Sequence, residues 1–515
     1  MLRPPSSAGA FRDPTINSPA KPLRHGHPSM PNRLKPRPRM LKVTAQNHSS
    51  SRSLGSGLKV RHLTMMGLGS TIGAGLFLGT GVGISAAGPA VLLAYLNAGF
   101  LAILVMQMLG EMGTVIPASG SFSEYAEHGI GRWAGFTQGW IYWLATVAVL
   151  GAEITGAAGF IGAWFNCPPW IPAAICVALF GTINLLRVRL FGEFEYWFAF
   201  IKVAVIIAFL AIGALLIFGL LPGHTFIGTS VFLADGFMPN GLGGVAAGLL
   251  AVAFAFGGIE VVAIAAAESE DPEKSLVNAV RTTITRISVF YLGSVLVITF
   301  LLPYSSLGSA QSAAESPFTM VLDRAGIPGA AAIMEVVIVL ALLSAFNAQI
   351  YASSRMMHSL ASRGEAPKLF AATDRRGVPT AAIALSVILS AVMVVLNYAD
   401  TGWLLSFMLN AAGASLLIVW VFIAVSQLRL RPQLEAIHPL PVRMWAYPYL
   451  TWFALALFAA IAVLMLSDAS ARIQLFSAAA MFAVLAIAGV INARARGIAP
   501  TSRLPLPTGE ELEAR

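Results

Sequence analysis

Residues 66–79 read MGLGSTIGAGLFLG, an apolar stretch that carries glycine at nearly every third position in its middle. Glycine weakens a helix interior by about 1 kcal/mol relative to alanine, so this stretch unwinds more easily than its neighbours. Residues 254–260 read FAFGGIE and repeat the weakness, with a glycine pair followed by a carboxylate. Both stretches lie inside apolar runs long enough to cross a bilayer. We therefore expect two helices that break partway across a membrane.

The composition of the whole chain agrees with a membrane protein. Of its 515 residues, 57% are hydrophobic and 11% are charged, against roughly 25% charged residues in soluble domains. This balance excludes a soluble globular protein. The net charge of +9 accompanies an apolar majority, so nucleic acid is not expected as a partner. No His/Cys cluster has metal-ligand spacing, and neither a metal site nor a cofactor is expected.

Twelve apolar stretches near 20 residues follow one another, each long enough to cross a bilayer core of about 30 Å as a helix. Backbone groups must be satisfied internally in lipid, so these stretches are predicted to be helices and the fold class all-α integral membrane. The stretches are 63–87, 89–112, 133–162, 170–187, 195–219, 241–267, 283–303, 330–353, 380–398, 402–426, 446–467 and 473–493.

The positive charges between these stretches predict the orientation. With the amino terminus in the cytosol, all but three of the 33 Lys and Arg residues fall on the cytosolic side. The exceptions are Arg324 and Arg472 outside, and Lys202 in the middle of a stretch. We expect a multi-pass protein of the cell membrane with both termini cytosolic. The domains are a disordered basic tail (1–57), a transmembrane domain (58–495) and a cytosolic carboxyl tail (496–515).

The two glycine-rich stretches lie five spans apart, which is typical of inverted repeats of five helices that hold a ligand where both chains unwind. Freed N–H groups near Ala74 and Gly75 suit a carboxylate, because they lie at the positive end of a half-helix. Freed carbonyls suit an ammonium group, so an amino acid satisfies both. The alternative is that the glycines are close-packing contacts between helices. The substrate-binding residues predicted from this pattern are Thr71, Ile72, Gly73, Ala74, Gly75, Gly257, Gly258 and Ile259.

From residue 57 to about 492 the chain resembles bacterial amino-acid permeases of the amino-acid/polyamine/organocation superfamily. The matching motifs are IGAGLF (72–77), AGPA (87–90), GSFSEYA (120–126), FGEFEYWF (191–198) and AAAESEDPEK (265–274). Three further stretches look most like γ-aminobutyrate permeases, namely GRWAG (131–135), GFMPNG (236–241) and RMWAYP (443–448).

The resemblance implies a ten-helix inverted-repeat core with two further helices, which imports an amino acid together with a proton. It places the unwound parts of the first and sixth helices around the ligand. Phe254 resembles an aromatic gate residue over the substrate. Lys202 matches a lysine that, in proton-coupled relatives, takes the place of a sodium ion and reaches the unwound first helix.

Four charged side chains within or at the end of spans stand out, because each charge at membrane depth costs at least about 2.5 kcal/mol. Lys202 either carries the coupled proton, because burial disfavours its charged form, or snorkels to the cytosolic interface. Glu260 is either a brace for the broken backbone or a proton relay. Glu153, in the middle of a span, is expected to select the ligand or exchange protons. Glu111, at the end of a span, is a gate brace or a solvated end.

The predicted function is proton-coupled import of an amino acid, γ-aminobutyrate or a neutral one, by alternating access. Amino-acid exchange on the same fold is the main alternative, although an obligate exchanger has no need of a proton site at Lys202. An integral membrane enzyme is the alternative from another class. None of the eight histidines lies inside a span, so acid–base or metal-assisted catalysis lacks its usual residues. The sequence leaves the oligomeric state open.

Overall fold

The first predicted membrane helix is interrupted in the structure. The computed structural model describes residues 57–69, 72–186, 188–307, 316–399, 404–467 and 469–506, which lie within one unit, Ser50–Arg515. Helix α1 (Val60–Gly69) ends before α2 (Ala74–Phe77), and α3 (Gly79–Ala87) continues from there. Gly73 precedes α2 with φ −147° and ψ −144°, which is extended backbone and not helix. The predicted break is therefore present at the predicted glycines.

The sixth predicted helix is interrupted in the same way. Helix α9 (Gly241–Ala255) ends at the glycine pair, and α10 (Val261–Ala266) begins directly after Glu260. Gly258 has φ +96°, a backbone conformation that a residue with a Cβ adopts only under strain. The glycine pair thus makes a turn between the two helices that other residues would resist.

Helices occupy all twelve apolar stretches of the sequence. By length and composition, seven helical stretches in the described part of the chain can cross a membrane, and three shorter apolar helices accompany them. The seven are Ala74–Val115, Arg132–Phe165, Phe191–Ile217, Pro272–Leu301, Ala330–Ser362, Ala411–Ile437 and Ala471–Ala495. The remaining bounds are α4 (Val91–Val115), α5 (Phe122–Gly129), α6 (Arg132–Phe165), α7 (Trp170–Leu185), α8 (Val188–Ile217), α11 (Pro272–Thr285), α12 (Leu292–Leu301), α13 (Pro317–Arg324), α14 (Ala330–Ser362), α15 (Thr380–Ala399), α16 (Leu404–Ile437), α17 (Tyr449–Met465) and α18 (Ala469–Ala495).

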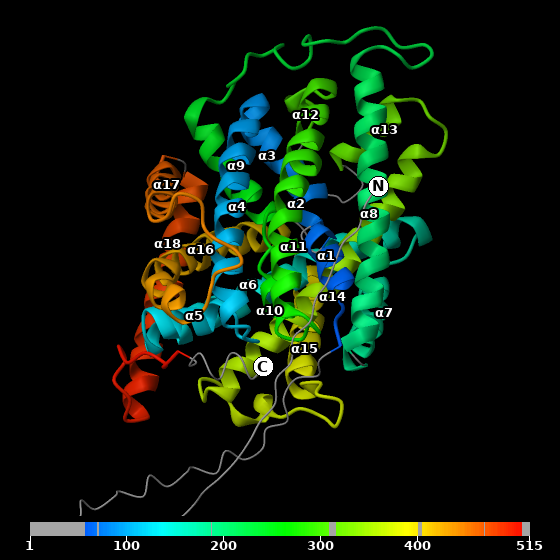
Figure 1. The fold of residues 1–515 in the computed structure, drawn as a ribbon. Coiled ribbons are helices and arrows are strands. Elements are labelled where there is room, and N and C mark those ends of the chain that lie inside the picture. The colour runs from blue at the N-terminus through cyan, green and yellow to red at the C-terminus, as the bar shows by residue number, and fades with distance from the viewer. Residues whose placement is uncertain are drawn as a thin grey trace, which may run out of the picture. The chain divides into compact units, whose positions relative to one another are not determined.

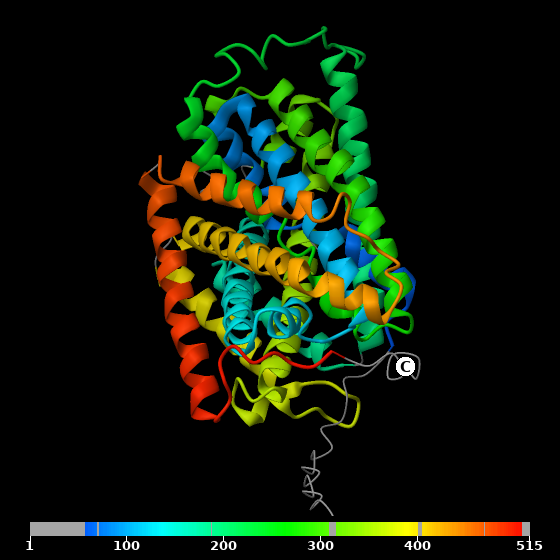
Figure 2. The same cartoon turned by 60° about the vertical axis from the view of Figure 1, so that its left-hand side comes forward.

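The two interrupted helices lie side by side in the middle of the bundle (Figure 1). Helix α3 packs along α9, while α1 packs against α8 and α11. Helices α6 and α14 cross next to the breaks, and α16 packs on both α6 and α9. Helices α17 and α18 contact α16 and lie at the edge of the bundle (Figure 2). Both breaks are thus enclosed by long apolar helices.

Candidate functional site

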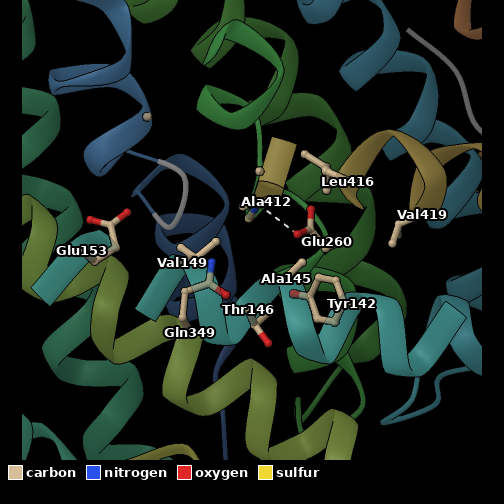
Figure 3. Close-up of a pocket in the computed structure, with 13 residues that line it drawn as sticks. Tyr142, Ala145, Thr146, Val149, Glu153, Glu260, Gln349, Ala412, Leu416 and Val419 are labelled. Atoms are coloured by element: carbon tan, nitrogen blue, oxygen red, sulfur yellow. Dashed lines mark hydrogen bonds between the residues drawn. The ribbon is translucent and has the colours of Figure 1, made fainter. Parts of the chain in front are cut away.

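A pocket with about 510 Å³ of unfilled space lies where the two breaks meet α6, α14 and α16 (Figure 3). Apolar side chains line it together with carboxylate, amide and hydroxyl groups. The lining residues are Gly75, Tyr142, Ala145, Thr146, Val149, Glu153, Gly257, Gly258, Glu260, Gln349, Ala412, Leu416 and Val419.

Two oppositely charged side chains hold the two ends of the first break. The Lys202 ammonium donates a hydrogen bond to the Gly69 carbonyl oxygen at 2.9 Å, at the carboxyl end of α1. Both carboxylate oxygens of Glu153 lie 3.1 Å from the Ala74 amide nitrogen, at the amino end of α2. A cation at a helix carboxyl end and an anion at an amino end both match the helix dipole. The open backbone of the first break is therefore stabilised by charge from α8 and α6.

Close packing explains the glycine at the centre of this break. A Cβ on Gly73 would lie 2.6 Å from the Glu153 Oε1 atom and 2.7 Å from the Ala345 Cβ atom. Real Cβ atoms do not approach other atoms so closely, so a side chain here would displace the carboxylate or α14. Gly73 therefore lets the Glu153 carboxylate approach the main chain.

Arg286 also reaches the first helix, although the sequence analysis assigned it to the cytosolic side. Its side chain is 1% exposed, and its Nη1 atom donates to the Gly67 carbonyl oxygen. Arg286 begins a π-helical turn, Arg286–Tyr291, between α11 and α12. Such turns occur often at functional sites. Lys202 is thus not alone among the basic residues inside the bundle, and the carboxyl end of α1 binds two cations.

The second break is held by its own residues. The Gly258 amide donates to the Glu260 Oε1 atom at 3.1 Å, only two residues along the chain. The Val261 amide donates to the Gly258 carbonyl oxygen at 3.2 Å and closes the turn. Figure 3 shows the Glu260 carboxyl on the side of the pocket next to Tyr142, away from Glu153. Glu260 therefore has the geometry of the predicted brace.

Two hydrogen-bond acceptors on the pocket wall lack partners in the described part of the chain. They are the buried Oε1 atom of Gln349 and the buried Oε2 atom of Glu260. Burying such an acceptor unpaired costs about 1–3 kcal/mol. Each of them is able to accept a hydrogen bond from an N–H donor of a ligand. The wall of Val149, Leu416 and Val419 is suited to an apolar side chain.

The pocket contains only part of the predicted binding set. Gly75, Gly257 and Gly258 line it, together with Glu153 and Glu260. Gly73 and Ala74 form the break beside it. Ile72 and Ile259 are buried next to the breaks and are not among the lining residues. Thr71 and the side chain of Phe254, both predicted to bind substrate, lie outside the part of the chain that the structure describes. The backbone of Phe254 belongs to α9.

Two alternatives raised from the sequence do not fit the structure. Lys202 is 1% exposed and turns toward α1, so it does not snorkel to an interface. Glu111 is fully buried and is not a solvated end. Its carboxylate accepts bonds from the Arg431 Nη1 atom at 2.7 Å, the Gln427 side chain at 2.8 Å and the Met444 amide at 2.7 Å. These contacts join α4 to α16 and to the chain before α17, as a brace does.

Sequence reasoning missed the face of α6 that lines the pocket. Tyr142, Thr146, Val149 and Glu153 follow one another at spacings of four, three and four residues, which places them on one side of a helix. Glu153 could therefore have led to the other three. Gln349 gives only a weak signal from sequence, because an uncharged amide in a long apolar helix is not unusual.

A second buried acid was also missed. Glu195, on α8, is 1% exposed and accepts bonds from the Asn347 side chain at 2.7 Å and the Ser344 hydroxyl at 2.9 Å. Asn347 in turn accepts a bond from the Asn184 amide at 2.8 Å. This cluster connects α7, α8 and α14. Lys202 also lies on α8. In the sequence, Glu195 stands within the motif FGEFEYWF (191–198), and nothing there singles it out as a buried acid.

Two broken helices that meet at a polar pocket inside an apolar bundle define a multi-pass membrane transport protein and not an enzyme. The model of the family described as "Amino acid permease" matches residues 62–497. The chain therefore belongs to the amino acid permease family.

Two relatives and one solved structure are similar over most of their lengths. The "Aromatic amino acid transport protein AroP" of Corynebacterium glutamicum is 60% identical over 87% of this chain and 98% of that protein. The "Gamma-aminobutyric acid permease" of Bacillus subtilis is 43% identical over 83% of this chain and 91% of that protein. The crystal structure of the manganese transporter of Eremococcus coleocola shares the fold, with a TM-score of 0.54 at 14% identity over 85% of this chain and 94% of that one.

Proposed function

We propose that the protein imports a neutral amino acid with an aromatic side chain, together with a proton. The observation that carries the proposal is the pair of ionisable groups at the first break, Lys202 on Gly69 and Glu153 on Ala74. Each side chain stabilises its helix end more strongly in its charged form than in its neutral form. Loss or gain of a proton there would loosen the break beside the pocket.

The proposed binding mode follows from the two sides of the pocket. The substrate ammonium group binds the unpartnered oxygen atoms of Gln349 and Glu260, and the substrate carboxylate binds main-chain N–H groups near Gly75. The substrate side chain lies against Val149 and Leu416. In this mode the ammonium and carboxylate groups of the substrate bind to the broken helices and α14. Residues of α6 and α16 contact the substrate side chain and so select it.

Two observations favour an aromatic substrate over γ-aminobutyrate. The apolar wall offers contact area to a ring, whereas γ-aminobutyrate has only a short methylene chain to place there. The 60% identical relative is named for aromatic amino acids, and the γ-aminobutyrate permease is 43% identical. Exchange of amino acids remains the second candidate, and Lys202 argues against it, since an exchanger needs no proton site.

The proposed architecture has twelve spans in the cell membrane, with two five-helix repeats related by inversion and α17 and α18 added outside them. The two breaks, five spans apart, support the repeats. The distribution of Lys and Arg supports cytosolic termini. Alternating access then moves the broken helices relative to α6, α14 and α15.

The test is uptake of labelled phenylalanine by the full chain in proteoliposomes, with an inward proton gradient. Tyrosine, tryptophan, leucine, glutamate, lysine and γ-aminobutyrate serve as competitors. We expect gradient-driven accumulation and competition by the aromatic amino acids at the lowest concentrations. Stronger competition by γ-aminobutyrate than by tyrosine would overturn the substrate assignment, and uptake that is independent of the proton gradient would overturn symport.

A further inference from the structure

An apolar groove lies outside the substrate pocket, between α16, α17, α18 and the start of α6. It has about 1200 Å³ of unfilled space, more than twice that of the substrate pocket. We call it the outer groove and define it by Trp133, Leu417, Val421, Arg429, Phe458 and Phe482.

The outer groove continues an apolar surface of the bundle. Helix α18, one wall of the groove, exposes Ile473, Phe476, Val484 and Ile487. The same helix is long and apolar enough to cross a membrane. Such a face lies against lipid acyl chains in a bilayer, so the groove opens toward lipid.

One end of the groove carries a positive charge without a counterion. Arg429 is exposed, and its guanidinium has no hydrogen bond or ion pair among the described residues. Its neighbour Arg431, by contrast, pairs with Glu111 and Glu435. Trp133 lines the same groove, and Trp and Arg are both enriched where a helix meets lipid headgroups.

The dimensions of the groove suit one acyl chain. Along α16 the lining runs from Ala414 to Arg429, which corresponds to about 22 Å of helix. Figure 2 shows α16 running across α18, so an acyl chain with its head at Arg429 lies along α16.

We propose that the outer groove binds an acyl chain of an anionic phospholipid, whose phosphate pairs with Arg429. The lipid fills the space between α17, α18 and α16 and so supports the two outer helices. A second copy of the chain would instead bury the Arg429 charge, and a buried charge without a partner is costly. The assignment of this lipid to the cytosolic leaflet rests on the orientation given under the proposed function. The other parts of the proposal do not depend on that orientation.

The test measures lipid binding to the detergent-solubilised full chain by native mass spectrometry. The probes are phosphatidylglycerol and phosphatidylcholine with identical palmitoyl and oleoyl chains. We expect one bound phosphatidylglycerol to persist where phosphatidylcholine dissociates. Arg429→Gln should weaken phosphatidylglycerol binding about fivefold, and Arg375→Gln, an exposed arginine away from the groove, should leave it unchanged.

A second pair of variants tests the groove itself. Ala479 lines the groove, and its exposed neighbour Ala480 does not. Ala479→Phe should exclude the lipid, whereas Ala480→Phe should retain it, and phenylalanine uptake by both shows that they fold. Equal binding of both lipids to wild type and Arg429→Gln would overturn the proposal. Dimers that Ala479→Phe converts to monomers would also overturn it, because a second copy would then be the occupant.

Discussion

The two breaks look alike in sequence and differ in what holds them. The first break depends on side chains from other helices, Lys202 from α8, Glu153 from α6 and Arg286 at the start of the π-helical turn. The second is closed by Glu260, two residues from the glycine that it binds, and this carboxyl also interacts with Tyr142 of α6 and with the charge of Arg286. A break held from outside changes when distant groups move or change charge. A break held from within keeps its shape, so the first break is the one suited to proton coupling.

The largest effect is expected at Lys202. In Lys202→Ala the Gly69 carbonyl loses its cation, and no group at this position can carry a proton. Accumulation driven by an imposed pH gradient should therefore disappear, while exchange of labelled for unlabelled substrate continues. Lys368→Ala, an exposed lysine at the start of a short 3-10 helix (Lys368–Ala371), is the matched control and should accumulate substrate normally. Equal accumulation by wild type and Lys202→Ala would show that the first break does not couple transport to protons.

Gly73→Ala should have the next largest effect. The added methyl group would overlap Glu153 and Ala345, and overpacking of this kind costs about 1–3 kcal/mol. We expect the initial rate of phenylalanine uptake to fall roughly tenfold to a hundredfold, since 1.4 kcal/mol corresponds to a factor of ten. Gly243→Ala is the control, because a Cβ there meets no atom within 4 Å. Similar rates for the two variants would mean that Glu153 does not need its close approach to the first break.

Sequence reasoning found the breaks but not the partners of the first one. Glycine clusters lower local helix stability, so the sequences of residues 66–79 and 254–260 are sufficient to predict that these helices break. The pocket face of α6 and the amide of Gln349 depend instead on how α6, α14 and α16 pack, which one sequence does not encode locally. Arg286 shows the same limit: it lies near a predicted span end, and only the packing of α11 on α1 carries its guanidinium to Gly67.

Glu153→Gln and Glu260→Gln compare the two breaks directly. Each substitution keeps an acceptor oxygen and removes a negative charge. Glu153 stabilises a helix amino end across 79 residues of sequence, so its loss should weaken apparent substrate affinity about tenfold. Glu260 accepts a bond within its own turn, and its loss should weaken affinity about threefold. The measurement is the concentration for half-maximal phenylalanine uptake, and a larger effect at Glu260 would reverse the assignment of the two breaks.

The smallest effect on transport is expected from a carboxyl group outside both breaks and outside the spans. Glu365 follows α14, and burial raises its pKa to about 7, although Arg363 opposes the shift. The folded state therefore binds this proton more tightly than the unfolded chain does. Its stabilising contribution is present below the ordinary carboxyl pKa of about 4.3 and is lost as the pH rises to 7.

Glu365→Gln keeps the group neutral at every pH, so the variant should resist thermal unfolding better than wild type at pH 8 and equally at pH 4. The upper limit of the difference is about 4 kcal/mol, because the pKa is raised by roughly 2.7 units and one pKa unit is worth about 1.4 kcal/mol. The pH profile of uptake should stay the same, since Glu365 lies at neither break. A changed uptake profile with unchanged stability would place a coupling group in this loop and would end the assignment of proton coupling to the first break alone.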